Sequence, residues 1–211
     1  MVLLIVSELG PKDTSWNIIK IIFQLSWLKK QSSVCTVDRI LKLHNVPATL
    51  AHFEAYHDAV KARARRGRPG AGRCSTDGNE LLRFHYAALA CSLGARGGRR
   101  APTSAPFRAP GVKTMATSSR MHDDAVGGEE GEVAGGERRR AMLVCWAIAG
   151  RVKRRCKATE ETAGKEEEEE GAEEEYDSVA GTAGVYSSLD ELEVFNPTVI
   201  LPCFIVIYKA I

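Results

Sequence analysis

The chain has 211 residues, of which 44% are hydrophobic and 27% are charged. That length suits one domain with a sizeable core and excludes two domains of ordinary size. The net charge of +2 is the balance of separate blocks, basic at residues 61–73 and 138–157 and acidic at 160–175. No stretch approaches the roughly 20 apolar residues of a membrane span. We therefore expect an intracellular protein, nuclear or cytoplasmic, without membrane contact.

The six cysteines form no Cys-x-x-Cys pair and no compact framework. Structural zinc sites and small disulfide-stapled domains both depend on such spacing. We expect reduced thiols and no bound metal.

The N-terminal region, residues 1–34, contains an amphipathic pattern. Apolar side chains recur there at helical spacing, at Ile18, Ile19, Ile22, Phe23 and Trp27. Asp13, Thr14 or Ser15 can cap a helix that starts there. Because the helix carries little positive charge, packing against the domain is favoured over a role at a membrane surface or in partner binding.

The next segment runs from residue 35 to residue 94. Its apolar residues between 36 and 45 fit a strand or a helix, and a stripe follows Pro47 at helical intervals, at Leu50, Phe53, Tyr56 or His57, and Val60. The stripe predicts a helix. The histidines at 44, 52 and 57 lack the spacing of metal ligands, and we expect solvent-facing or capping roles for them.

The basic stretch KARARRGRPGAGR (Lys61–Arg73) is rich in glycine and predicts a flexible connection to the next strand. Contact with nucleic acid through its Lys and Arg side chains is the alternative, and a nuclear-import signal would use the same residues. Leu81, Leu82 and Phe84 then indicate a short buried strand that ends at His85. A lone histidine there is ordinarily a core or edge residue satisfied by a carbonyl.

Low-complexity composition at residues 95–110 predicts a linker, and the Glu-rich stretch at 157–175 predicts a solvated insertion. Between them, AMLVCWAIAGRV (Ala141–Val152) is apolar on both faces, as expected of a central strand. Glu191–Phe195 and Val199–Ile207 predict two last strands, joined at Asn196-Pro197, that close the sheet.

Three segments in one order carry a resemblance to a known family. GNELLRFHYAALACSL (Gly78–Leu93) resembles the LFHGT region of the poly(ADP-ribose) polymerase (PARP) superfamily. VDRILKLHNVPATLAHFEAY (Val37–Tyr56) is similar to the lead-in of its mono-ADP-ribosylating members, and Tyr176–Val206 resembles their closing segment. KIIFQLSWL (Lys20–Leu28) and RAMLVCWAIAGRV (Arg140–Val152) are similar to the plant branch associated with zinc-finger-like cysteines.

The resemblance implies an α+β fold of the ADP-ribosyltransferase type, a mixed sheet with flanking helices, interrupted here by disordered low-complexity insertions. It favours a strand for residues 36–45, and a strand followed by a helix for Gly111–Ala125. The implied organisation is an N-terminal helical region, a first part of the domain, a linker and a second part with an acidic insertion, at residues 1–34, 35–94, 95–110 and 111–211, with the insertion at 157–175.

The resemblance also implies a site for NAD+. In this superfamily a histidine binds the adenine-side ribose, a tyrosine stacks on nicotinamide, a glycine pairs with the carboxamide and a glutamate orients the nicotinamide ribose. His85 and Glu191 match the histidine and the glutamate, and they are the catalytic candidates.

Further positions match cofactor-binding residues, with departures. Phe84 keeps the aromatic residue before the histidine, but Tyr86 stands where the family has the glycine. Lys113 stands where it has the stacking tyrosine, and Ser119 or Ser118 lies near its carboxamide-binding serine. Lysine has no flat face and puts a positive charge beside a cationic ring.

These assignments predict transfer of single ADP-ribose units from NAD+ to a protein acceptor, impaired by Tyr86 and Lys113. Two alternatives remain open. One is a catalytically inactive interaction module that kept the sheet and lost the pocket. The other is a truncated or mis-spliced gene product, because residues 95–110 stand where the family has part of its NAD+ pocket.

Overall fold

The computed structural model describes residues 5–30, 34–66, 72–86, 111–127, 139–154, 176–181 and 189–210. The strands in these ranges are β1 Ile5–Glu8, β2 Cys35–His44, β3 Glu80–Tyr86, β4 Val112–Met115, β5 Arg140–Ile148, β6 Val152–Arg154, β7 Ser178–Ala180, β8 Glu191–Val194 and β9 Ile200–Ala210. The helices are α1 Thr14–Leu25, α2 Pro47–Arg66, α3 Gly72–Asp77 and α4 Ser118–Gly127, with short 3₁₀ turns η1 Trp27–Lys29 and η3 Pro197–Val199.

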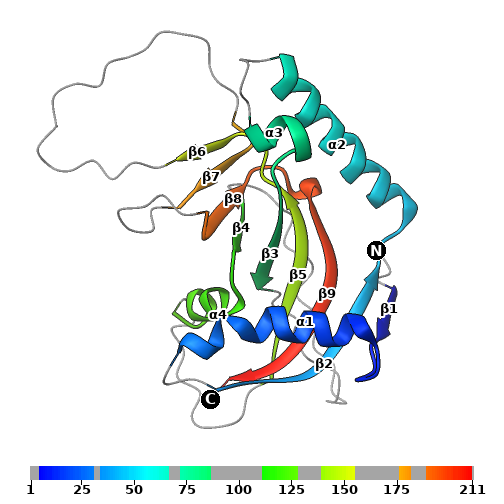
Figure 1. The fold of residues 1–211 in the computed structure, drawn as a ribbon, viewed down its shortest axis with the longest axis vertical. Helices are drawn as coiled ribbons and strands as arrows, with labels where there is room; N and C mark the ends of the chain where they lie inside the picture. Colours follow the sequence, from blue (N-terminus) through cyan, green and yellow to red (C-terminus); the bar gives the residue numbers. More distant parts are fainter. Residues whose placement is uncertain are drawn as a thin grey trace, which may run out of the picture.

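All nine of these strands belong to one mixed sheet, in the order β1-β2-β9-β5-β3-β4-β8-β7-β6 (Figure 1). Every neighbouring pair is antiparallel except β6 and β7, which are parallel. The molecule is therefore of the α+β class, as the sequence predicts. None of the described helices is long and apolar enough to cross a membrane.

Strand β5 lies near the middle of the sheet, between β9 and β3. Its side chains are buried on both faces, which explains the unbroken apolar run in its sequence. Trp146 is the exception, since 41% of its surface is exposed. The prediction of a central strand at this place is confirmed.

Helices cover both faces of the sheet and divide the core into layers. On one face, Phe23 and Trp27 pack with α4 residue Met121 over Phe84 and Tyr208 of the strands. On the other face, α2 packs over the ends of β5, β8 and β9, with a second cluster of apolar residues that includes Phe53, Val60, Ile148, Leu192, Val194 and Leu201. In Figure 1, α1 crosses the lower half of the sheet and α2 runs along its upper right side.

Helix α1 confirms the amphipathic prediction and its cap. The Asp13 carboxylate accepts a hydrogen bond from the Ser15 backbone N–H at 2.7 Å, which satisfies one free donor of the first turn. Ile19 and Phe23 are buried, but Ile18 is 50% exposed and does not belong to the core face. The N-terminal region also contributes β1, an edge strand paired with β2, which the sequence did not indicate.

The expected flexible connection at Lys61–Arg73 is wrong for the residues that the structure describes. Helix α2 continues to Arg66, and Gly72 starts α3. Ala62 and Ala64 within the Arg-rich stretch are strong helix formers that allow the helix to continue, and Ala64 is buried.

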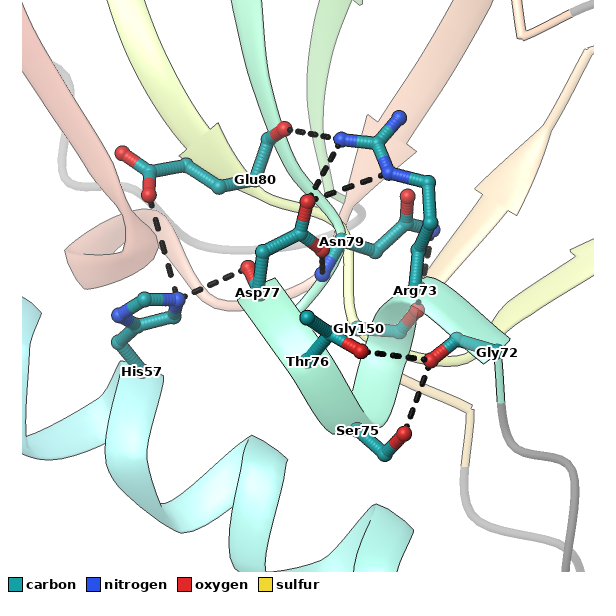
Figure 2. A network of polar contacts seen from close by, with 9 residues as sticks. All are labelled: His57, Gly72, Arg73, Ser75, Thr76, Asp77, Asn79, Glu80 and Gly150. Atoms are coloured by element: carbon teal, nitrogen blue, oxygen red, sulfur yellow. Dashed lines mark hydrogen bonds and ion pairs between the residues drawn. The ribbon is translucent and has the colours of Figure 1, made fainter.

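The turn that leads from α3 into β3 is held by a polar network, shown in Figure 2. Arg73 donates to the Asp77 carboxylate at 2.9 Å and to the Glu80 carbonyl at 3.1 Å. Asn79, in the left-handed region with φ 59°, donates from its side chain to the Gly150 carbonyl at 3.3 Å. The network joins α3 to the starts of β3 and β6, and it fixes where β3 enters the sheet.

The last two strands occur where the sequence predicts them but do not pair with each other. Strand β8 lies between β4 and β7, whereas β9 lies between β2 and β5. Both strands lie inside the sheet, whose edges are β1 and β6. Asn196 caps η3 by accepting from the Thr198 N–H at 3.0 Å, and this turn carries the chain across to the centre of the sheet. The predicted linker at 95–110 and the acidic insertion at 157–175 lie outside the described residues.

Candidate functional site

Strands β3, β4 and β8 are neighbours in the sheet and bring distant parts of the chain together. The ladder between β3 and β4 has one paired position, Phe84 with Met115. On both sides of that pair, side chains of β3 reach the backbone of β4 instead, from Arg83 and from His85. The two strands are thus held at this end largely by side chains.

His85 is half-buried on β3 and bonds to the backbone of β4. Its Nδ1 lies 2.9 Å from the carbonyl oxygen of Lys113, and because a carbonyl can only accept, Nδ1–H is the donor. In the neutral ring, Nε2 is then left as a hydrogen-bond acceptor. The arrangement fixes the tautomer and leaves one polar atom for a hydroxyl donor.

Lys113 on β4 is surrounded by carboxylates. Its Nζ lies 2.5 Å from Oδ1 of Asp124 on α4 and 3.5 Å from Oε1 of Glu191 on β8. Glu193 is the residue directly opposite it on β8. The hydrogen bond to Asp124 is the main cause that raises the pKa of Lys113, with partial burial opposing it, so the group is firmly cationic.

Glu191 is the first residue of β8 and lies opposite Met115 of β4. Its side chain is 39% exposed, so the carboxylate can meet a ligand from solvent. Gly181 lies against it: the Gly181 N–H donates to the Glu191 carbonyl at 3.0 Å, and a Cβ there would lie 2.8 Å from the Glu191 Cβ. Because glycine has no Cβ, residue 181 leaves space for the Glu191 side chain.

Arg83 is a part of the site that the sequence reading missed. It is 2% exposed, and its guanidinium donates to the Leu189 carbonyl at 2.6 Å and to the carbonyls of Thr114 and Asp190 at 3.3 Å each. Burial lowers its pKa to about 10, and the charge of Asp190 opposes that shift. Arg83 thereby ties β3 to β4 and to the two residues that precede Glu191.

A signal for Arg83 was present in the sequence. An arginine inside an apolar strand is rarely buried without partners. Those partners could not be predicted, because they are backbone carbonyls from a segment more than a hundred positions away.

The other predicted site residues pack in the core or contact α1 and the turn after it. The Phe84 ring is 2% exposed and packs edge-on against Phe23 at 5.9 Å, so it is a core residue. Tyr86 is half-buried and packs against the same cluster. Ser119 is 5% exposed, and its N–H donates to the Ser26 hydroxyl at 3.2 Å.

Ser118 is built into the contact between α4 and α1. Its hydroxyl accepts from the Trp27 indole N–H at 2.9 Å and donates to the Phe23 carbonyl. The structure thus joins His85, Lys113 and Glu191 through contacts, and gives both serines partners in α1 and the turn after it.

Basic side chains of Lys61–Arg73 have partners within the fold. Arg63 pairs with the buried Asp177, Lys61 with Asp58 at 2.7 Å, and Arg73 with Asp77 (Figure 2). These pairs engage three of the charges that a nucleic-acid phosphate would otherwise attract, whereas Arg65 and Arg66 are exposed. Among the described residues, no group of three or more His, Cys, Asp and Glu side chains could hold a metal ion.

Comparison of the sequence with protein-family models and with the curated proteins found no match in either.

Proposed function

We propose that this chain is an NAD+-binding protein of the PARP superfamily, of the ADP-ribosyltransferase type, with impaired transfer of single ADP-ribose units to a protein. The observation that carries the proposal is the connection of His85, Lys113 and Glu191. These residues stand at the family's histidine, stacking and glutamate positions, and they lie on the adjacent strands β3, β4 and β8. A chance likeness of three short segments would not require their positions to converge.

The chemistry of ADP-ribose transfer suits the carboxylate of Glu191 and the imidazole of His85. Cleavage of the bond between nicotinamide and ribose leaves an oxocarbenium-like sugar, which a nearby carboxylate stabilises. The half-exposed Glu191 carboxylate supplies that charge and can accept from a ribose hydroxyl. The Nδ1–H of His85 donates to the Lys113 carbonyl. Its Nε2 is then able to accept a hydrogen bond from a hydroxyl of the adenine-side ribose.

Lys113 is the reason for proposing impaired activity. Its ammonium group lies beside Glu191 and cannot stack on nicotinamide, whose ring is cationic in NAD+. It also neutralises part of the negative charge that the oxocarbenium-like sugar needs. Poor positioning of a bound substrate commonly lowers the reaction rate far more than the binding affinity. We therefore expect detectable NAD+ binding with slow turnover.

The ion pairs of Lys113 also support a second candidate function, a non-catalytic interaction module. An ammonium group held between Asp124 and Glu191 fills the place of a ligand and stabilises the empty site. In that case the sheet persists as a scaffold, and substitution of His85 or Glu191 leaves partner binding unchanged.

Labelled NAD+ tests the proposal. The purified chain is incubated with it, and label retained on protein is measured for wild type, His85→Ala and Glu191→Ala. The exposed helix residues His52 and Glu54, substituted by alanine, are matched controls of the same residue types. We expect the retained label to fall in His85→Ala and Glu191→Ala and to stay at the wild-type level in the two controls. Label absent from wild type, or equal in all variants, would sink the transferase proposal.

A further inference from the structure

Helix α1 has a second apolar stripe, on the side opposite its core face. Ile18, Ile21, Leu25 and Leu28 are 50%, 63%, 61% and 81% exposed. They follow one another at intervals of three, four and three residues, which places them in one row along α1 and into η1. The buried residues Ile19, Phe23 and Trp27 lie on the opposite side of the helix axis. Figure 1 shows α1 on the outside of the sheet.

A helix that only covers a sheet needs one apolar face. Helix α2, which covers the other face of the sheet, follows that rule, since its outward positions include Glu54, Asp58 and Arg65. An apolar row outside the core face is ordinarily buried by a partner. The intervals of the row are those of the a and d positions of a coiled coil.

The charges around the stripe indicate the kind of partner. The stripe itself contains no charged residue, and two basic residues near it, Lys20 and Lys30, make contacts within the chain. Lys20 lies over the Trp16 ring at 4.7 Å, and Lys30 pairs with Asp123. A membrane surface or an acidic peptide would be recognised by free cationic groups beside an apolar face. A neutral apolar row of the same spacing is the better complement.

The same row on a second copy of this chain meets that description. An isologous contact places identical surfaces together, and it carries no like-charge repulsion here because the row is uncharged. An antiparallel pairing is favoured because the two helix dipoles then oppose each other. The positions 18, 21, 25 and 28 are symmetric about residue 23. In an antiparallel pair, position 18 therefore lies opposite 28 of the other copy, and position 21 lies opposite 25.

We propose that two copies associate through antiparallel packing of their α1 helices, with Ile21 against Leu25 of the partner subunit and Ile18 against Leu28 of the partner subunit. Four side chains from each copy make a small interface. The dimer is therefore weak and reversible, with a dissociation constant of roughly 1–100 µM. The inference is independent of the proposed function.

Sedimentation velocity over about 1–200 µM protein tests it, since that range spans the expected constant. Wild type is expected to shift from monomer to dimer. Ile21→Glu is expected to weaken the dimer at least about tenfold, because it buries an unpaired charge. Val126→Glu, at an exposed apolar residue of α4, is the matched control and leaves the dimer unchanged. All these sites are exposed, so the variants keep the wild-type melting transition.

Geometry is tested by a charge pair. The double variant Ile21→Glu with Leu25→Lys restores dimerisation only if residue 21 of one copy meets residue 25 of the other. Wild type that stays monomeric at the highest concentration overturns the proposal. So does a dimer that persists with Ile21→Glu, and so does monomeric wild type that binds anionic vesicles, which would assign the stripe to a membrane surface.

Discussion

The ammonium group of Lys113 lies 3.5 Å from the carboxylate of Glu191, and the carbonyl of the same lysine holds the ring of His85. One residue therefore touches both candidate catalytic groups. Its backbone orients one of them, and its side chain partly neutralises the other. Substitutions at 113 can alter the second effect while keeping the first.

Lys113→Tyr is expected to increase NAD+ affinity by about fivefold to tenfold, because it removes a positive charge and supplies an aromatic face. Isothermal titration measures the change. Lys113→Arg, which keeps the charge, is the control and is expected to bind as wild type does. Equal affinities for all three proteins would show that the side chain at 113 does not face nicotinamide.

Arg83→Met is expected to lower the free energy of unfolding by about 3 kcal/mol, since it leaves one buried and two part-buried carbonyls without this donor. Denaturant unfolding measures it. Arg83→Lys keeps the charge but not the planar fork, and an intermediate loss is expected. A loss below about 0.5 kcal/mol for Arg83→Met would contradict the role of Arg83 in joining β3 to the residues before Glu191.

Gly78→Ala is expected to destabilise the protein by about 1–3 kcal/mol. Gly78 has φ 60°, and a Cβ there would lie 2.5 Å from Cδ2 of His57. Gly10→Ala is the matched control, because a Cβ at Gly10 meets nothing within 4 Å. Thermal unfolding of the two variants compares them, and similar midpoints would mean that the turn into β3 adapts without strain.

His122 predicts a pH dependence of stability. Burial, followed by the charge of Arg140 and more weakly that of Lys30, lowers its pKa below the ordinary value of 6.5, and Asp123 opposes the shift. The unfolded chain then takes up a proton at a higher pH than the folded chain does. This contribution to stability is full above about pH 6.5 and falls as the pH drops through the folded-state pKa.

His122→Gln should flatten that part of the profile, and denaturant unfolding between pH 5 and pH 8 measures it (roughly the range in which histidine titrates). The exposed His52→Gln is the control. A steeper fall in the variant than in wild type would contradict the assignment to His122, whose ring contacts the Tyr208 hydroxyl at 2.9 Å.

The local elements could be predicted where a single pattern decides them. Local sequence predicts α1, β5 and β9. Helix α1 has a capped row of apolar residues, β5 has an apolar run on both faces, and β9 has a long apolar run. Sheet order could not be read in this way. Strands β8 and β9 are adjacent in the chain but separated in the sheet, because long-range pairing with β4 and β2 decides their places.

The candidate site was predictable only through the resemblance. Neither His85 nor Glu191 stands out by periodicity, and Lys113 mattered because it departs from the family pattern. Asp124 and Arg83 were missed because their roles depend on contacts across the sheet, with Lys113 and with the Leu189 and Asp190 carbonyls. The Phe84 ring lies in the core against Phe23, and its assignment to cofactor binding stays a prediction.

Thermal unfolding with and without NAD+ tests the central claim most directly, because a ligand that binds only the folded state raises its midpoint. At a concentration about a hundredfold above the dissociation constant the gain is about 2.7 kcal/mol, or roughly 5 °C or more for a chain of this size. The account predicts that rise for wild type and its loss in His85→Ala. A cooperative transition that NAD+ leaves unchanged, in wild type and in Lys113→Tyr alike, would contradict it.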